Sequence, residues 1–315
     1  MDTSLNSFKL VKLQFILKAS DDINLPVYKG STFRGGFGNA FKKIVCVNRD
    51  KDCDSCMLKG KCVYSYVFET PPPSDTSKMR KYPFAPHPFI ITPPLEKDRI
   101  YRKGETLCFD LTLIGKSIDH LPYFIYTFDE LGKIGIGKGR GGYHLEEVKC
   151  EGQTIYSSQS KTLKNDYKTI GIKDLVSSLP HPSTLQVNFL TPTRLKFEGK
   201  LTRALEFQVL IRNLLRRISL LSYFHCGEEL SLDFKGIIEK SQEVLTTKSD
   251  LSWIDWERYS SRQETRMKMG GFVGSATFSG EFEPFLPFLL LGEYVHVGKG
   301  TSFGLGKYRI SREGS

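Results

Sequence analysis

Apolar and polar residues alternate along the first stretch of the chain. Over residues 8–19, every second side chain from Val11 onward is apolar and its neighbours are mostly polar. A period of two predicts a β-strand with one buried face. The same alternation returns over residues 101–115, and a further strand is expected over residues 143–150. Between these strands we expect a short helix at residues 39–45 and an aromatic-rich helix at residues 122–131.

The second half repeats these signals. A strand is expected over residues 185–197, and residues 202–226 predict the clearest helix of the chain. Its apolar stripe has helical spacing and consists of Phe207, Ile211, Leu214, Ile218 and Leu221. Further elements are expected as a helix at 234–244, a strand at 253–259, a hairpin at 264–280, an apolar helix at 282–294 and a strand at 307–310. Gly270-Gly271 is a suitable two-residue turn for that hairpin.

Each half therefore runs strand, helix, strands, apolar helix, glycine-rich run and final strand. The glycine-rich runs are residues 132–142 and residues 298–306. This repeat predicts an α+β chain of two tandem ferredoxin-like domains, the β-α-β-β-α-β arrangement that single-strand RNA-recognition modules also use. We expect the domains at residues 1–150 and 183–315, joined by a linker at residues 151–182 that is rich in Ser, Lys and Thr.

Charge and composition narrow the class of protein. The 315 residues include 45 Lys and Arg against 35 Asp and Glu, so the net charge is +10. This excess favours a polyanionic partner. No apolar run is long enough to cross a membrane, and the N-terminus lacks the apolar core of a signal peptide. We therefore expect a cytoplasmic protein without a membrane partner.

Four of the seven cysteines lie close together, at Cys46, Cys53, Cys56 and Cys62. The two-residue gap between Cys53 and Cys56 allows both thiolates to reach one metal ion. We expect a cysteine-rich insertion in the first domain that holds a structural zinc, with an iron–sulfur cluster or no metal as the alternatives. Four protein ligands would leave no open position, so this metal would brace a loop and not catalyse. Such crowding fits a reducing compartment better than a disulfide scaffold.

The glycine-rich runs do not predict a nucleotide cofactor. Residues 132–138 fit a phosphate-loop spacing, but Gly139 stands where Ser or Thr must bind magnesium. A strand follows the run, so no helix N-terminus would face a pyrophosphate. Two interpretations remain: the backbone N–H groups approach a phosphodiester backbone, or the glycines form a tight crossover between packed elements.

Positive residues and histidines supply candidates for binding and chemistry. Arg258, Arg262, Arg266 and Lys268 share one parity, so on a strand they would contact phosphates or form a solvated face. His296 lies just before the second glycine-rich run and close to Lys299. An imidazole there could transfer a proton while the ammonium stabilises negative charge. The alternative is that His296 only ends the preceding helix or orients the loop.

The chain resembles the CRISPR precursor-RNA-processing endoribonucleases of the RAMP superfamily. The resemblance covers nearly the whole sequence, and the C-terminal glycine-rich run is its most specific mark. It is carried by residues 30–35, the four clustered cysteines, and residues 86–89, 189–194, 216–217, 256–258, 262–263, 270–274 and 297–306.

The resemblance implies two ferredoxin-like domains that bind CRISPR repeat RNA. It also implies metal-independent cleavage in which a ribose 2′-OH attacks the adjacent phosphorus, leaving a 2′,3′-cyclic phosphate and a 5′-OH end. No metal or nucleotide cofactor is needed for that chemistry, and other CRISPR effector subunits are further expected partners. The implied RNA-binding residues are Arg258, Arg262, Gln263, Arg266, Lys268, Gly298, Gly300, Thr301, Ser302, Gly304 and Gly306.

The implied catalytic region lies in or near the first helix of the first domain, where many relatives carry a histidine. This sequence has no histidine before His87. The resemblance therefore leaves Tyr28, Arg34, Lys42 and Lys43 as candidates, beside His296 and Lys299. Two alternatives stay open: a non-catalytic RNA-binding subunit of a CRISPR effector complex, and a zinc-braced protein-interaction module.

Overall fold

The computed structural model describes residues 5–48, 52–176, 182–260 and 265–312. Contacts divide the chain into two units. The N-terminal unit contains Lys9–Ile170 and Phe224–Gly227, and the C-terminal unit contains Met1–Phe8, Gly171–Tyr223 and Glu228–Ser315. Within the described parts of the chain, no helix is long and apolar enough to span a membrane.

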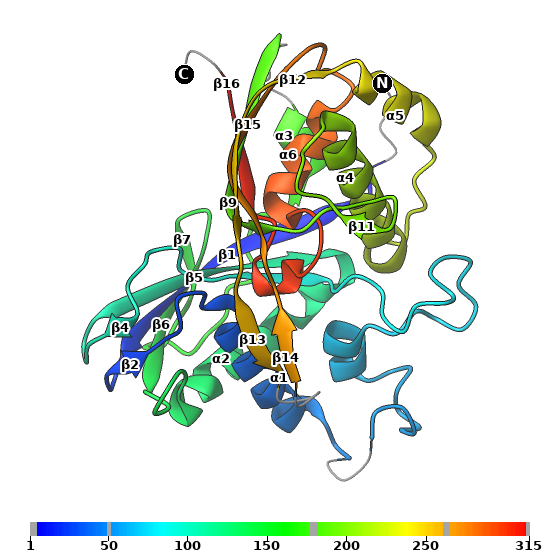
Figure 1. The fold of residues 1–315 in the computed structure, drawn as a ribbon. Helices are drawn as coiled ribbons and strands as arrows, with labels where there is room; N and C mark the ends of the chain where they lie inside the picture. The colour runs from blue at the N-terminus through cyan, green and yellow to red at the C-terminus, as the bar shows by residue number, and fades with distance from the viewer. Residues whose placement is uncertain (1–4, 49–51, 177–181, 261–264, 313–315) are drawn as a thin grey trace. The chain divides into compact units, whose positions relative to one another are not determined.

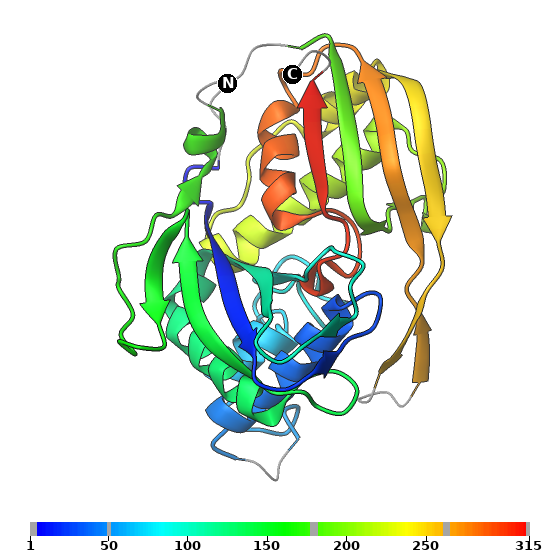
Figure 2. The ribbon, with the colours of Figure 1, turned by 90° about the vertical axis from the view of Figure 1, so that its left-hand side faces the viewer.

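A five-strand path forms the sheet of the N-terminal unit. The strands are β1 (Lys9–Ala19), β3 (Phe89–Thr92), β5 (Thr106–Ile114), β6 (Tyr143–Cys150) and β7 (Gln153–Ser157). Their order is β3-β5-β1-β6-β7, and the short β8 (Ile170–Gly171) also pairs with β1. Helices α1 (Gly30–Val45) and α2 (Leu121–Ile134) cover one face of this sheet, as Figure 2 shows. With α1 after β1 and α2 after β5, the unit is ferredoxin-like. Two short strands, β2 (Ile23–Asn24) and β4 (Ile100–Tyr101), pair beside it.

Segment 153–157, which the sequence places in a linker, is part of this sheet. It pairs with β6, and the side chain of Ile155 is buried. Residues as far as Ile170 belong to the N-terminal unit. The polar composition of the segment reflects an edge strand with one exposed face.

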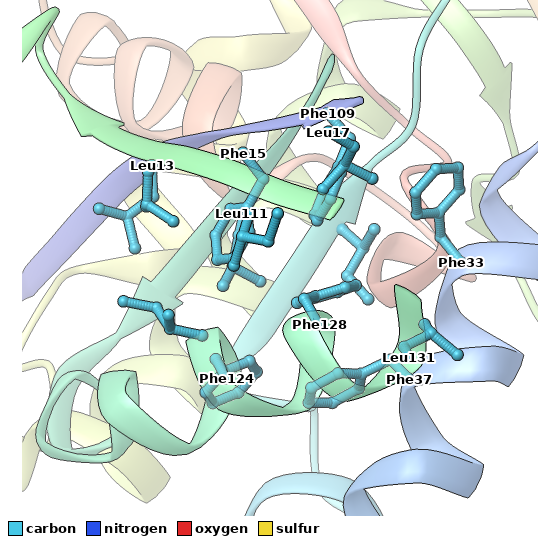
Figure 3. Close-up of a cluster of buried hydrophobic side chains, with 14 of the residues drawn as sticks. Leu13, Phe15, Leu17, Phe33, Phe37, Phe109, Leu111, Phe124, Phe128 and Leu131 are labelled. Carbon is cyan, nitrogen blue, oxygen red and sulfur yellow. The ribbon is translucent and has the colours of Figure 1, made fainter. Parts of the chain in front are cut away.

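Phenylalanine dominates the core of the N-terminal unit (Figure 3). Phe15 on β1 stacks on Phe109 of β5 with ring centroids 4.9 Å apart. Phe37 on α1 stacks on Phe124 and Phe128 of α2 at 4.9 and 5.1 Å. The sheet's buried face and both helices therefore meet through aromatic rings.

Helix α1 begins at Gly30, whereas the sequence pattern placed a loop there and started the helix at residue 39. Phe33, Phe37 and Phe41 follow one another at four-residue spacing, and all three are fully buried. This packing outweighs the low helix propensity of the glycines. Gly38 is required by space, because a Cβ atom there would overlap the ring of Phe68.

The C-terminal unit repeats the topology. Its strands β9 (Thr184–Thr193), β12 (Leu245–Ile254), β15 (Gly271–Ser279) and β16 (Tyr308–Arg312) are ordered β12-β15-β9-β16. Helices α4 (Phe207–Leu221) and α6 (Leu286–Val295) pack against one face of this sheet (Figure 1). Further elements of this unit include α3 (Ile172–Val176), β10 (Lys196–Phe197), β11 (Lys200–Leu201) and α5 (Phe234–Gln242), and a π-helix at Ser222–Cys226 crosses into the N-terminal unit.

The expected hairpin at residues 264–280 is wrong. Strand β14 (Thr265–Lys268) pairs with β13 (Glu257–Ser260), and β15 pairs with β12. Gly271 is the first residue of β15, and it pairs with Ile254. A Cβ atom at Gly271 would press against the backbone of Thr193 on β9. The glycine pair thus serves close strand packing and is not a turn.

Candidate nucleic-acid interface

Two glycine-rich loops occupy equivalent places in the two units. The first glycine loop, residues 135–142, joins α2 to β6, and the second glycine loop, residues 297–306, joins α6 to β16. In the first, the Lys138 N–H donates to the carbonyl of Asn24 at 2.8 Å. In the second, the Lys299 N–H donates to the carbonyl of Arg194 at 3.1 Å. Both loops are therefore anchored to the segment that follows the first strand of their unit.

Glycine is required at the matching positions of the two loops. Gly137 has φ 76° and Gly298 has φ 82°. A Cβ atom would overlap the carbonyl of Asn24 at the first position and the carbonyl of Arg194 at the second. These two glycines thus fit the crossover interpretation, in which the backbone passes close to a packed neighbour.

His296 is the residue that ends helix α6. Its side chain is only 2% exposed, and its Nδ1 lies 3.1 Å from the carbonyl oxygen of Leu305. A carbonyl only accepts, so Nδ1 carries a proton and donates it to that bond. The buried ring connects the end of the helix to the second glycine loop. This agrees with the alternative interpretation, in which His296 ends the helix and orients the loop. Its burial does not favour the predicted proton transfer to an RNA.

A cluster of positive charges surrounds the second glycine loop. We define the cation cluster as Arg194, Lys196, Arg216 and Lys299. Burial first, and then these neighbouring cations, lower the pKa of Lys299. Burial also lowers the pKa of Arg194. Every charged group that shifts the pKa of Lys299 is a cation, so the cluster would gain from a bound anion such as a phosphate.

Arg194 adds a second indication of an anion site. Its Nη1 donates to the sulfur of Met269 at 3.4 Å, a weak acceptor. Its Nε is buried, and no hydrogen-bond partner for that atom occurs among the described residues. The resemblance includes Arg194 and Arg216 without giving them a role, and it does not include Lys196. All three join Lys299 only through the fold.

The basic strand candidates are placed only in part. Arg262 and Gln263 lie outside the described residues. Arg258 belongs to β13, and Arg266 and Lys268 belong to β14. The register pairs position 258 with 267 and position 259 with 266. The side chains of these candidates lie outside the described residues, so their contact with phosphates stays a prediction.

A cavity of about 940 Å³ lies between α1, α2 and the first glycine loop. Three cations line this basic cavity: Lys42, Lys43 and Arg140. The remaining lining residues are Thr32, Gly36, Asn39, Ala40, Cys46, Leu131, Ile134, Gly135, Ile136 and Gly137. The Nζ of Lys42 also lies 5.6 Å from the ring centre of Tyr64. The positive charge of this cavity suits a phosphate chain.

Arg34 and Tyr28 take different positions from the two lysines. The Arg34 guanidinium lies 4.2 Å from the ring centre of Phe68, and its Nη2 is 3.1 Å from Nε2 of His87. Nδ1 of His87 is in turn 2.8 Å from the hydroxyl of Thr70. Burial raises the pKa of Tyr28 far above its ordinary value, so its hydroxyl stays protonated at neutral pH. No local sequence pattern indicates that Arg34 pairs with His87, because the two residues are 53 positions apart.

The clustered cysteines are free thiols. Cys46 and Cys62 lie near enough to Cys53 to act on its pKa, which burial raises and which Lys42 lowers. Thiolates are suitable zinc ligands, but in the residues that the structure describes no three His, Cys, Asp or Glu side chains converge as a metal site. The geometry therefore does not show the predicted four-thiolate centre.

The two ferredoxin-like units share a glycine loop at the same place, before β6 in the first unit and before β16 in the second. Residues 187–308 match the family model described as CRISPR-associated endoribonuclease Cas6, and residues 8–168 match a family model described as an N-terminal domain. The N-terminal-domain model spans just over half of the chain, so the chain belongs to the family of that model, and its C-terminal part is similar to the Cas6 endoribonucleases.

Individual relatives agree with this assignment. An uncharacterized protein of Archaeoglobus fulgidus is 28% identical over 295 residues, which cover 91% of this chain and 93% of the relative. The Cas6 product complex of Thermus thermophilus superposes with a TM-score of 0.59 at 16% identity, covering 96% of this chain and 100% of that chain. A partial Cas6-RT-Cas1–Cas2 complex gives 0.58 at 17%, covering 98% of this chain and 47% of that chain. The two solved structures establish the likeness of fold.

Proposed function

We propose that this chain is an endoribonuclease that binds CRISPR repeat RNA and cleaves the precursor transcript into guide RNA. The observation that carries the proposal is the cation cluster on the second glycine loop, within the segment that matches Cas6. Burial and the neighbouring cations lower the pKa of Lys299, and a bound anion would counter the repulsion among the cations. A phosphodiester supplies that anion and belongs to the substrate that the family name implies.

The proposed reaction is an internal transesterification. A base removes the proton of a ribose 2′-OH, and the oxygen bonds to the adjacent phosphorus. The bond to the 5′ oxygen then breaks, which leaves a 2′,3′-cyclic phosphate and a 5′-OH. Cations hold the phosphate and stabilise its charge in the transition state. We assign binding of RNA phosphates to Lys299 in the C-terminal unit and, separately, to Lys42 and Lys43 in the basic cavity of the N-terminal unit.

One assay tests the proposal. Purified protein is incubated in EDTA with a labelled RNA that contains one CRISPR repeat from the genome encoding the chain. We expect one cut, with a cyclic phosphate at the 3′ end of the upstream product. An RNA with 2′-deoxyribose at the cleaved nucleotide should bind equally and stay intact. Binding without cleavage of either RNA would instead favour the non-catalytic subunit of a CRISPR effector complex, and no binding would contradict both.

The clustered thiols support a separate proposal, a structural zinc. Protein purified without chelator should contain about one zinc per chain, the stoichiometry of a four-thiolate site. Cys53→Ser should lose the metal and lower the stability of the N-terminal unit, whereas Cys108→Ser on β5 should keep the metal. Elemental analysis that finds neither zinc nor iron in the wild-type protein would contradict a metal here.

A further inference from the structure

His87 belongs to a chain of hydrogen bonds that fixes where its protons lie. Arginine nitrogens only donate, so Nε2 of His87 accepts from Arg34 Nη2 at 3.1 Å. The ring proton is then on Nδ1, which donates to the Thr70 hydroxyl at 2.8 Å. That hydroxyl donates onward to the carbonyl of Val67 at 3.3 Å. The imidazole is thus held neutral, with the lone pair of Nε2 facing a cation.

Aromatic packing fixes the orientation of the same ring. His87 stacks on Phe89 with centroids 5.8 Å apart and on Phe68 with centroids 6.3 Å apart. Phe68 also lies under the Arg34 guanidinium, so one ring positions both polar groups. His87 and Arg34 are each only partly buried. An oriented base and a cation are therefore available together beside helix α1.

The other described histidines lack this combination. His225 is 1% exposed and His296 is 2% exposed, so neither ring is available to a large substrate. Burial lowers the pKa of His120, and the rings that contact it are those of Tyr66 and Tyr123. His144 is exposed on strand β6. Of these rings, that of His87 meets the demands of proton transfer best, because its tautomer, orientation and neighbouring cation are all set.

We propose that His87 is the general base of the RNA cleavage, with Arg34 as the group that binds the scissile phosphate and Thr70 as a positioning residue. This inference rests on the proposed function. When a phosphate oxygen takes the Arg34 hydrogen bond, the Nε2 lone pair is released toward the ribose. Nε2 accepts the 2′-OH proton, the oxygen–phosphorus bond forms, the bond to the 5′ oxygen breaks, and that oxygen takes a proton from water.

The test uses single-turnover cleavage of the labelled repeat RNA with protein in excess. His87→Ala should lower the rate by about 10²–10⁴ while affinity stays within a few-fold. Added imidazole should restore part of the lost rate. His144→Ala, which removes an exposed histidine from the same unit, should cut at the wild-type rate. A folded His87→Ala protein that cuts normally would overturn the assignment.

An RNA in which sulfur replaces the 5′ leaving oxygen shows whether His87 acts as a general base or as a general acid. Sulfur leaves without protonation, so it would rescue His87→Ala if His87 were the acid, and this outcome would contradict a base.

If His87→Ala does not fold, a second pair of variants tests the inference. Thr70→Val should slow cleavage about tenfold or more because the His87 ring loses its orientation, and Thr70→Ser should restore the rate. Equal rates for those two variants would overturn the inference. If the wild-type protein binds the RNA but does not cut it, both the proposed activity and the role of His87 are contradicted. If the wild-type protein cuts and the His87→Ala protein cuts equally fast, only the role of His87 is contradicted.

Discussion

The two glycine loops follow the same path but end their helices differently. Helix α2 ends at Gly135 with φ 81°, whereas α6 ends at the equivalent His296 with φ 58°. The first loop is anchored by backbone hydrogen bonds such as Lys138 to Asn24. The second has the matching backbone bonds and, in addition, a buried imidazole bonded to Leu305. A positive φ is unfavourable for a residue other than glycine. The packing and the hydrogen bond of the His296 ring must therefore offset this cost.

The equivalent lysines teach a second lesson. Lys138 and Lys299 follow matching glycines and donate matching backbone hydrogen bonds. Burial and the neighbouring cations Lys196, Arg194 and Arg216 lower the pKa of Lys299. The fold therefore sets the backbone of both loops, and the surrounding segments decide which cations lie near each loop. We take the second loop as the more specialised of the two.

Substituting the close-packed glycine should give the largest effect. In Gly298→Ala the new Cβ atom meets the Arg194 carbonyl, and φ is 82°. We expect the free energy of unfolding to fall by about 2–4 kcal/mol, from overpacking and backbone strain together. Gly139→Ala has a similar φ of 86° but open space around it, so only about 1 kcal/mol should be lost. Denaturant unfolding checks both, and equal losses would contradict the role given to the carbonyl.

Replacing the helix-ending ring should give the next effect. His296→Ala leaves the Leu305 carbonyl without its donor and should cost about 2 kcal/mol. His296→Gly, which copies Gly135 of the first loop, should recover a few tenths to 1 kcal/mol of this loss, because glycine adopts a positive φ without strain. With protein in excess, both variants should cut RNA within a few-fold of wild type. A hundredfold slower cut in a folded His296→Ala protein would restore the ring as a proton-transfer group.

Removing one lysine from each loop compares their charge directly. Lys299→Ala should weaken binding of repeat RNA several-fold. It should also lower the slope of log affinity against log salt by about 0.7, the value for one phosphate contact on a single strand. Lys138→Ala should change both quantities less, because Lys138 lies outside the cation cluster. Filter binding at several salt concentrations measures both variants, and identical slopes would break the contrast between the loops.

The lowered pKa of Lys299 predicts a smaller, pH-dependent effect. Protonated Lys299 binds phosphate, so RNA affinity should fall as pH rises through this lowered pKa. Lys299→Arg keeps its charge and should bind with a flatter pH dependence. The stability of the protein without RNA should change with pH in the opposite direction to RNA affinity. Because the pKa is lower in the folded than in the unfolded state, Lys299 destabilises the fold at low pH, and this penalty disappears as pH rises above its unfolded value. Affinity measured across the alkaline range tests the assignment.

Local patterns predicted several strands, and long-range packing explains the failures. The alternation over residues 101–115 matches β5 because it depends only on neighbours in sequence, whereas the strand expected at 253–259 runs across the end of β12 and into β13. The start of α1 was missed, because glycines are helical there only in contact with elements such as Phe68. The four-residue spacing of Phe33, Phe37 and Phe41 was the available signal. In the candidate site, Lys42 and Lys43 do line a cavity, but no local pattern could reveal that Arg34 meets His87.

The two units exchange short pieces of chain, and this has a consequence for synthesis on the ribosome. Residues 5–8 belong to the C-terminal unit, where Leu5 and Phe8 are buried. Phe224–Gly227 belongs to the N-terminal unit, where His225 donates to the carbonyl of Pro86 at 2.7 Å and accepts from Tyr66 at 3.3 Å. The nascent N-terminal half therefore cannot complete its packing until more than two-thirds of the chain has been translated. The first few residues made wait longest of all for their native partners.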